Sequence, residues 1–76
     1  MKIYNEVVAI IAKELEVSVD IISDDTAIGD IESWDSLHQI AIISALEGHY
    51  GFQFEPETIM DMEDVGDIVA AVEKRV

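Results

Sequence analysis

The stretch ESWDSLHQI, residues 32–40, places a small hydroxyl group between an acid and an apolar run with helical spacing. Asp35 and Ser36 are residue types whose side chains accept backbone N–H bonds at the start of a helix. The run that follows predicts a helix from Asp35 to about Tyr50, which Gly51 is well placed to end. The stretch therefore predicts the start of a central helix. It leaves open whether Ser36 only begins that helix or also carries a chemical group.

The predicted central helix has two different faces. We expect its core face to hold Ile40, Ile42, Ile43, Leu46 and Tyr50. The opposite face is small and uncharged, with Asp35 and Glu47 towards its ends, and it holds Leu37, Ala41, Ser44, Ala45 and Gly48. An outward helix face usually carries charge, so either a loop covers this one or a partner protein docks on it. We favour docking, because a mildly apolar patch rimmed by polar groups is typical of interfaces.

Apolar residues also recur at helical spacing near both ends of the chain. The shared faces hold Ile3, Val7, Ile10, Ile11 and Leu15 in the first segment, and Val65, Ile68, Val69, Val72 and Val76 in the last. Each pattern predicts an amphipathic helix. Lys74 and Arg75 fall in the last turn of the second one, where cations suit the helix dipole. Between these segments, Pro56 in EPETIM predicts the first turn of a short helix.

The acidic segment VSVDIISDDTAIGDIESWD, residues 17–35, predicts an ordered loop. Its apolar residues should pin it to the core, and they are Ile21, Ile22, Ile28, Ile31 and Trp34. Trp34 is expected to act as a plug. VSVDI and YGFQF alternate like strands, but a lone strand pair is the weaker interpretation in so small a chain. The predicted fold class is therefore all-α: a small four-helix bundle of three longer helices and one short one, with a long first loop.

Composition limits the possible partners. The 76 residues form one domain at most, which we place at residues 1–76, and they include 17 acids, 4 bases and no cysteine. A formal net charge of −13 opposes binding to nucleic acids and anionic membranes. It either attracts partners with basic patches or merely keeps the protein soluble. We found neither a signal peptide nor a membrane-spanning run, so we expect a cytoplasmic, soluble monomer.

Two functions of the loop and the serine have weak support. A catalytic serine needs a base within reach, but His38 lies two positions along the helix from Ser36 and points away, and His49 is several turns further on. Both histidines are expected to be solvated rather than to bind a metal. Counting Asp24 as position one of an EF-hand puts Ile28, which has no side-chain oxygen, at position five. A small acidic interaction or calcium-responsive module without a prosthetic group remains the alternative function.

A covalent attachment point is the stronger functional hypothesis for Ser36. A phosphodiester there would lie at a helix N-terminus, which free N–H groups and the helix dipole favour. The surrounding order of segments supports this hypothesis. DSL at residues 35–37 opens a helix that ends in ALEGHYGFQF, after IIAKELEV and an acidic loop, and before EPETI and DVGDIVAAVEKRV. Over essentially its whole length, the chain resembles an acyl carrier protein.

The resemblance implies a four-helix bundle in which Ser36 is esterified by 4′-phosphopantetheine, delivered from coenzyme A by a phosphopantetheinyl transferase. The arm ends in a thiol that holds acyl groups as thioesters for acyl-loading and acyl-processing enzymes. The carrier itself catalyses nothing and has no metal. Asp35 matches the family's acid before the serine, and Leu37 matches the apolar residue after it, which touches partners. On this reading Ser36 both starts the helix and holds the arm.

The chain also departs from fatty-acid carriers, whose second helix is rich in acids that partner enzymes read. The matching positions here are His38, Ala41, Glu47, Gly48 and His49, and only Glu47 among them is acidic. Trp34 replaces a residue that is small in those carriers. Both departures indicate a carrier of a specialised pathway, for which polyketide, peptide-type and surface-polysaccharide synthesis remain open. The predicted docking residues are Asp35, Leu37, Ala41, Ser44, Glu47 and Gly48.

Overall fold

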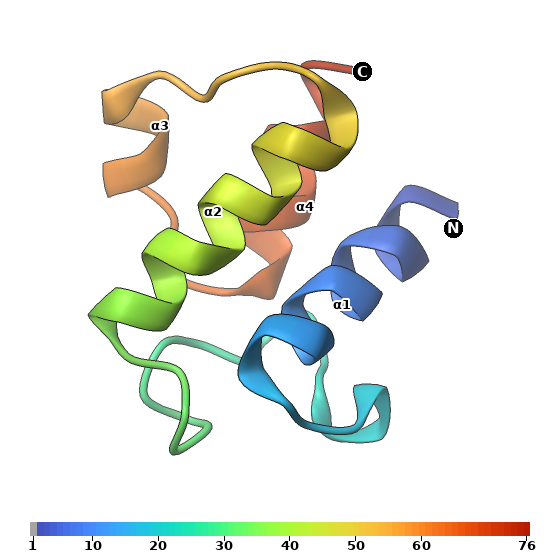
Figure 1. Ribbon diagram of the computed structural model, residues 1–76, viewed down its shortest axis with the longest axis vertical. Coiled ribbons are helices and arrows are strands. Elements are labelled where there is room, and N and C mark those ends of the chain that lie inside the picture. The colour runs from blue at the N-terminus through green and yellow to red at the C-terminus, as the bar shows by residue number, and fades with distance from the viewer. Residues whose placement is uncertain (1) are drawn as a thin grey trace.

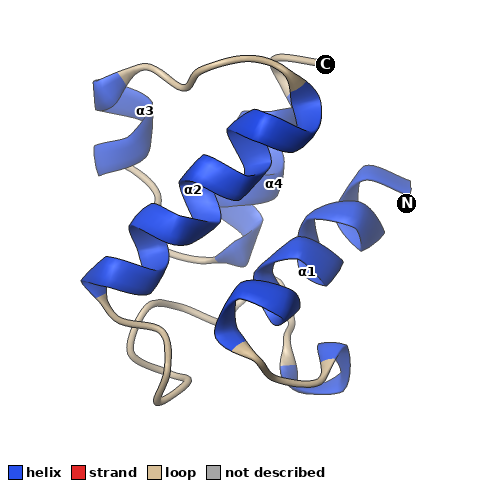
Figure 2. Ribbon diagram, viewed as in Figure 1, coloured by secondary structure: helices blue, strands red, loops and turns tan. Residues whose placement is uncertain are grey.

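The computed structural model describes residues 2–76, and within this range the regular structure is helical (Figures 1 and 2). In chain order the helices are α1 (Lys2–Leu15), the 3₁₀ turn η1 (Val19–Ile21), α2 (Ser36–Tyr50), α3 (Pro56–Met60) and α4 (Val65–Glu73). The prediction of three longer helices and one short one is confirmed. Neither VSVDI nor YGFQF forms a strand, since η1 occupies part of the first and the second ends α2. No helix among these residues has the length and apolar character needed to cross a bilayer.

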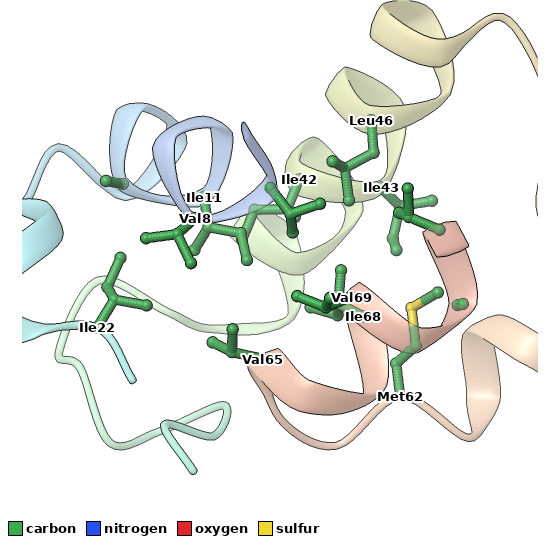
Figure 3. Packing of buried hydrophobic residues seen from close by; sticks show 14 of the residues in the cluster. Val8, Ile11, Ile22, Ile42, Ile43, Leu46, Met62, Val65, Ile68 and Val69 are labelled. Atoms are coloured by element: carbon green, nitrogen blue, oxygen red, sulfur yellow. The ribbon is translucent and has the colours of Figure 1, made fainter. Parts of the chain in front are cut away.

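The core lies where α1, α2 and α4 meet, and α1 packs against both of the others. Figure 3 shows their apolar side chains pointing toward one another, with Ile22 and Met62 at the sides. The predicted faces of α1 and α4 are largely confirmed. The fully covered residues are Val7, Ile11 and Leu15 on α1, and Val65, Ile68 and Val72 on α4. Val76 was wrongly assigned to the core, because α4 ends at Glu73 and Val76 is exposed.

The buried face of α2 differs from the predicted one at two neighbouring residues. Ile42, Ile43 and Leu46 are buried as expected, but 64% of the surface of Ile40 is exposed. Gln39 is buried in its place, at 9% exposure. The physical reason is helical spacing: Gln39 stands three, four and seven positions before Ile42, Ile43 and Leu46 and so shares their face. The buried indole N–H of Trp34 donates to the Gln39 amide oxygen over 2.8 Å and so gives this buried amide a partner.

The long connection between α1 and α2 is anchored by fewer apolar residues than predicted. Trp34 and Ile22 are buried, at 1% and 7% exposure, and Ile31 packs partly against the core. The prediction that Trp34 plugs the loop onto the core is confirmed. Ile21 and Ile28 are exposed, so their assignment as anchors was wrong. Backbone hydrogen bonds also anchor the loop, because they join it to the first turn of α4.

These bonds run from the N–H of Val65 to the carbonyl of Thr26 over 2.9 Å, and from the N–H of Gly66 to the carbonyl of Asp24 over 3.0 Å. At the other end of α2, Gly51 adopts φ +78°, a left-handed conformation that glycine tolerates without steric cost. Its N–H donates to the Glu47 carbonyl, so the predicted end of the helix is confirmed. Arg75, which follows α4, stacks over the Phe52 ring and so holds the segment after α2 against the C-terminal end of the chain.

A polar contact joins α1 to the last turn of α2. The Tyr50 hydroxyl donates to Glu6 Oε1 over 2.8 Å, in a partly buried setting. Burial, followed by the hydrogen bond and the nearby charge of Glu6, raises the pKa of Tyr50 to about 12. The phenol therefore favours the folded state only while it keeps its proton.

Two isoleucines two positions apart on α2 test the assignment of its faces. Ile42→Ala should lower the free energy of unfolding by about 2–5 kcal/mol, because it removes a fully buried side chain. Ile40→Ala makes the same chemical change at an exposed site and should stay within about 0.5 kcal/mol of wild type. Urea unfolding followed by circular dichroism measures both. Equal losses would show that Ile40 belongs to the core after all.

Alkaline pH tests the contact between Tyr50 and Glu6. Below pH 10, the usual pKa, the phenol is protonated in both folded and unfolded chains. As the pH rises through 10, the unfolded chain loses its proton first, so stability should fall until the folded phenol titrates near pH 12. Burial and then Asp24 also raise the pKa of Tyr4, so the informative quantity is the difference between wild type and Tyr50→Phe. Urea unfolding across this window should give a flatter curve for the variant, and parallel curves would contradict the assignment.

Candidate functional site

The first turn of α2 is organised by Asp35 rather than by Ser36. Asp35 has an extended backbone, and its Oδ1 accepts the N–H of His38 over 2.9 Å. Its carbonyl accepts the N–H of Gln39, also over 2.9 Å. The open question of which residue caps the helix is therefore decided for Asp35. Ser36 is the first residue of α2, as expected, but Asp35 is its cap and the side chain of Ser36 is exposed.

The Asp35 carboxylate stays ionised beside Ser36. The backbone N–H of His38, and then the His38 ring, hold the pKa of Asp35 below its usual value. His38 Nδ1 lies 2.9 Å from Asp35 Oδ1, with both side chains substantially exposed. One oxygen thus receives both contacts from His38. A negative charge therefore directly precedes the serine across the neutral pH range.

Both histidines are substantially exposed, as expected, and each also lies beside an acid. His38 contacts Asp35, and His49 Nε2 lies 3.9 Å from Glu6 Oε1, with its ring edge-on to Tyr50. Within residues 2–76 no three His, Cys, Asp or Glu side chains are grouped so as to hold a metal ion. In the loop that suggested an EF-hand, the Asp30 carboxylate accepts the N–H of Ala27 over 2.9 Å.

The uncharged face of α2 is open to solvent over much of its length. Leu37 is 76% exposed, Ser44 and Gly48 are exposed, and Ala41 and Ala45 are half-buried. Glu47, which we had placed at the rim of this face, is half-buried, and its Oε2 accepts the N–H of Phe54 over 2.9 Å. Its carboxylate therefore holds the segment that follows α2 in place.

The sequence interpretation missed the exposure of two apolar residues and the burial of one polar residue. Ile40 lies one helical turn after Ser36 and is 64% exposed, while Met60, at the end of α3, is 80% exposed. Gln39 was not singled out at all. A signal for it existed, because a buried tryptophan usually finds a partner for its indole N–H, and Gln39 is a polar side chain within reach of Trp34. For Met60 the sequence offered no comparable signal.

The site thus combines an exposed serine at the start of a 15-residue helix with an ionised cap and a mildly apolar flank. The N–H groups of a first turn and the helix dipole favour an attached anion such as a phosphate ester. Neither histidine is held beside the serine as a base, since each contacts an acid. The arrangement suits a serine that another enzyme modifies rather than the catalytic serine of a hydrolase.

Comparison with known proteins agrees with this geometry. Residues 5–72 match the family described as "Phosphopantetheine attachment site". Among solved structures, the chain is similar to the solution NMR structure of a holo acyl carrier protein from Geobacter metallireducens, at a TM-score of 0.86 and 27% sequence identity. The alignment covers 97% of this chain and 85% of that one. No curated protein sequence matches the chain.

These matches confirm the predicted fold class, the 4′-phosphopantetheine prosthetic group and the role of a carrier rather than a catalyst. They also imply, in general terms, that the chain meets a phosphopantetheinyl transferase and acyl-processing enzymes. The family match spans nearly the whole chain, and the fold agrees from end to end. The chain therefore belongs to the phosphopantetheine attachment site family and is an acyl carrier protein.

Proposed function

We propose that Ser36 is the residue that carries 4′-phosphopantetheine, and that the carrier serves a specialised pathway of the polyketide, peptide-type or surface-polysaccharide kind. The attachment proposal depends above all on one observation. The exposed Ser36 side chain stands at the N-terminus of α2, directly after an ionised cap. We further propose that the chain works as a single carrier domain, residues 1–76, and as a monomer.

Attachment requires Ser36 to act as an accessible oxygen nucleophile. Its Oγ forms a bond to the phosphorus that bears the pantetheine arm in coenzyme A, and the pyrophosphate bond on the other side breaks. Adenosine 3′,5′-bisphosphate leaves, and the hydroxyl proton passes to a base of the transferase. This chain contributes the hydroxyl and its orientation. Because Asp35 caps the helix, Ser36 can be modified without losing a hydrogen bond that starts α2.

The product of this step fits the start of α2. A phosphodiester carries a negative charge, and the first N–H groups of a helix have no partner within the helix. The Ser36 and Leu37 N–H groups lie nearest to the ester, while Asp35 already accepts the next two, from His38 and Gln39. When attached, the arm supplies a thiol that holds acyl groups as thioesters. The chain's own residues only fix where that arm begins.

The choice of a specialised pathway is supported by the surface beside Ser36. Partner enzymes of fatty-acid carriers are expected to read acids along the second helix, but here that surface is mostly uncharged. We propose that partners dock on Asp35, Leu37, Ala41, Ser44, Glu47 and Gly48, with Ile40 at the edge. Since the Glu47 carboxylate is engaged by Phe54 N–H, apolar contact should matter more here than charge. The net negative charge of the carrier would still attract partners with basic surfaces over a distance.

Replacement of Ser36 tests the attachment proposal. Incubation with coenzyme A, magnesium and a broad-specificity phosphopantetheinyl transferase should add one phosphopantetheine to wild type and none to Ser36→Ala, as read by intact-protein mass spectrometry. Because Asp35 is the cap, Ser36→Ala should change the free energy of unfolding by less than about 0.5 kcal/mol. Circular dichroism checks that the variant is folded. Modification of folded Ser36→Ala would move the site to another residue.

A charge placed on the uncharged face of α2 tests the docking proposal. Ser44→Glu should raise the KM for loading by the transferase, because the new carboxylate would lose its water against an apolar partner surface. Ala9→Glu on α1 is the matched control, since it adds the same charge at another exposed helical position. Loading rates are measured against carrier concentration at low and high salt. If Ser44→Glu changes the KM no more than Ala9→Glu does at either salt concentration, the proposed face is wrong.

A further inference from the structure

The residues on either side of Ser36 are joined by a buried side-chain hydrogen bond. Trp34 lies two positions before the serine and Gln39 lies three positions after it. The indole Nε1–H of Trp34 donates to Gln39 Oε1 over 2.8 Å. Trp34 is 1% exposed and Gln39 is 9% exposed, so water does not compete for this bond. In addition, the N–H of Gln39 donates to the carbonyl of Asp35, so two hydrogen bonds to Gln39 span Ser36.

The backbone of Trp34 is fixed as well. Its N–H donates to the carbonyl of Ile31 over 2.9 Å, and its own carbonyl accepts the N–H of Gly29 over 3.1 Å. The hydroxyl of the preceding residue, Ser33, donates to the carbonyl of Leu15 at the end of α1 over 2.9 Å. The segment that leads into Ser36 is thus tied to the loop, to α1 and to α2. The contacts of the Asp35 side chain with His38 also cross the serine, but they are exposed, whereas the bond between Trp34 and Gln39 is buried.

Packing alone does not explain a glutamine at this position. A buried amide loses hydration that an apolar side chain of similar size would not lose. A hydrogen bond, however, holds its two partners in one relative geometry, whereas apolar surfaces can slide over each other. The bond between Trp34 and Gln39 therefore restricts how the first turn of α2 sits on the core. Ser36 belongs to that turn.

We infer that Trp34 and Gln39 are a positioning pair that orients Ser36 for attack and so sets the rate at which a transferase can modify it. The inference rests on the proposed attachment at Ser36. Neither residue touches coenzyme A in this scheme, because both side chains are buried. The effect belongs to the turnover step rather than to docking, since the exposed face of α2 is left unchanged. Small misplacements of a reacting atom are enough to slow a transfer reaction substantially.

Two substitutions at Gln39 separate positioning from stability. Gln39→Leu has nearly the same size but removes the acceptor, whereas Gln39→Glu keeps an oxygen at the same reach. Both should lower the melting temperature, the first by leaving the indole N–H unpaired and the second by burying charge. At saturating carrier, Gln39→Leu should lower kcat for phosphopantetheine transfer about tenfold, while KM stays near wild type. Gln39→Glu should keep kcat within about twofold of wild type.

Val72→Ala is the control for a loss of stability far from the serine. It removes fully buried volume in α4 and should lower the melting temperature without changing kcat. All rates are measured well below the lowest melting temperature. A wild-type kcat in Gln39→Leu would overturn the inference. It would equally be overturned if Gln39→Glu or Val72→Ala lost as much rate as Gln39→Leu, because stability alone would then explain the effect.

A measurement on the wild-type chain keeps the inference testable even if a variant does not fold. The chain contains one tryptophan, so its indole N–H gives one assignable NMR signal. That proton should exchange with deuterium far more slowly than exposed amides, and exchange at the rate of exposed amides would overturn the inference. Peptide mapping of the modified wild type separates this result from the proposed function. Modification elsewhere than Ser36 refutes the attachment site, whereas modification of Ser36 at an unchanged rate in Gln39→Leu refutes only the positioning pair.

Discussion

The burial of one indole ring is the constraint on which most of this small structure depends. Trp34 stands at the end of a long connection that has little regular structure, and its side chain fills the core beside α2. A buried indole needs an acceptor for its N–H, and Gln39 provides it. Gln39 lies on the buried face of α2 with Ile42, Ile43 and Leu46, whereas Ile40 faces solvent. The exposed face, which includes Leu37 beside the serine, lies on the opposite side of the helix.

A second theme is how a chain with 17 acids and only 4 Lys and Arg residues uses its carboxylates. Several of them accept backbone N–H groups instead of forming ion pairs with those four cations. Asp35 and Asp64 cap α2 and α4, Asp30 closes a turn in the loop, and Glu47 holds Phe54. Hydrogen bonds from N–H groups to ionised oxygens are strong, so the acids contribute to the fold even though cations are scarce. The remaining charge stays at the surface, where it favours solubility and repels other anions.

These features suit a carrier. The attachment site must be rigid at its base, so that an enzyme can reach one oxygen, and yet exposed enough for a long arm to move freely. Asp35 and the buried contacts of Trp34 supply the rigidity, whereas the exposed Ser36 and Leu37 supply the access. The neighbours of the serine cap the helix and pack into the core: Asp35 is the cap, and Trp34 is buried. Under the proposed attachment, Ser36 would be modified without loss of the hydrogen bond that caps the helix.

The sequence by itself determined the four helices, the end of α2 and the carrier family, because those properties depend on local spacing and local chemistry. Apolar periodicity placed the core faces of α1 and α4, Pro56 began α3 and Gly51 ended α2. The exposure of Ile40, the burial of Gln39, the capping by Asp35 rather than Ser36 and the engagement of Glu47 were decided only by the tertiary structure. Periodicity placed Ile42, Ile43 and Leu46 on the buried face of α2, but it did not show that the polar side chain of Gln39 would be buried beside them. The burial of Gln39 depended on a partner for its amide oxygen, and the buried indole N–H of Trp34 provides that partner.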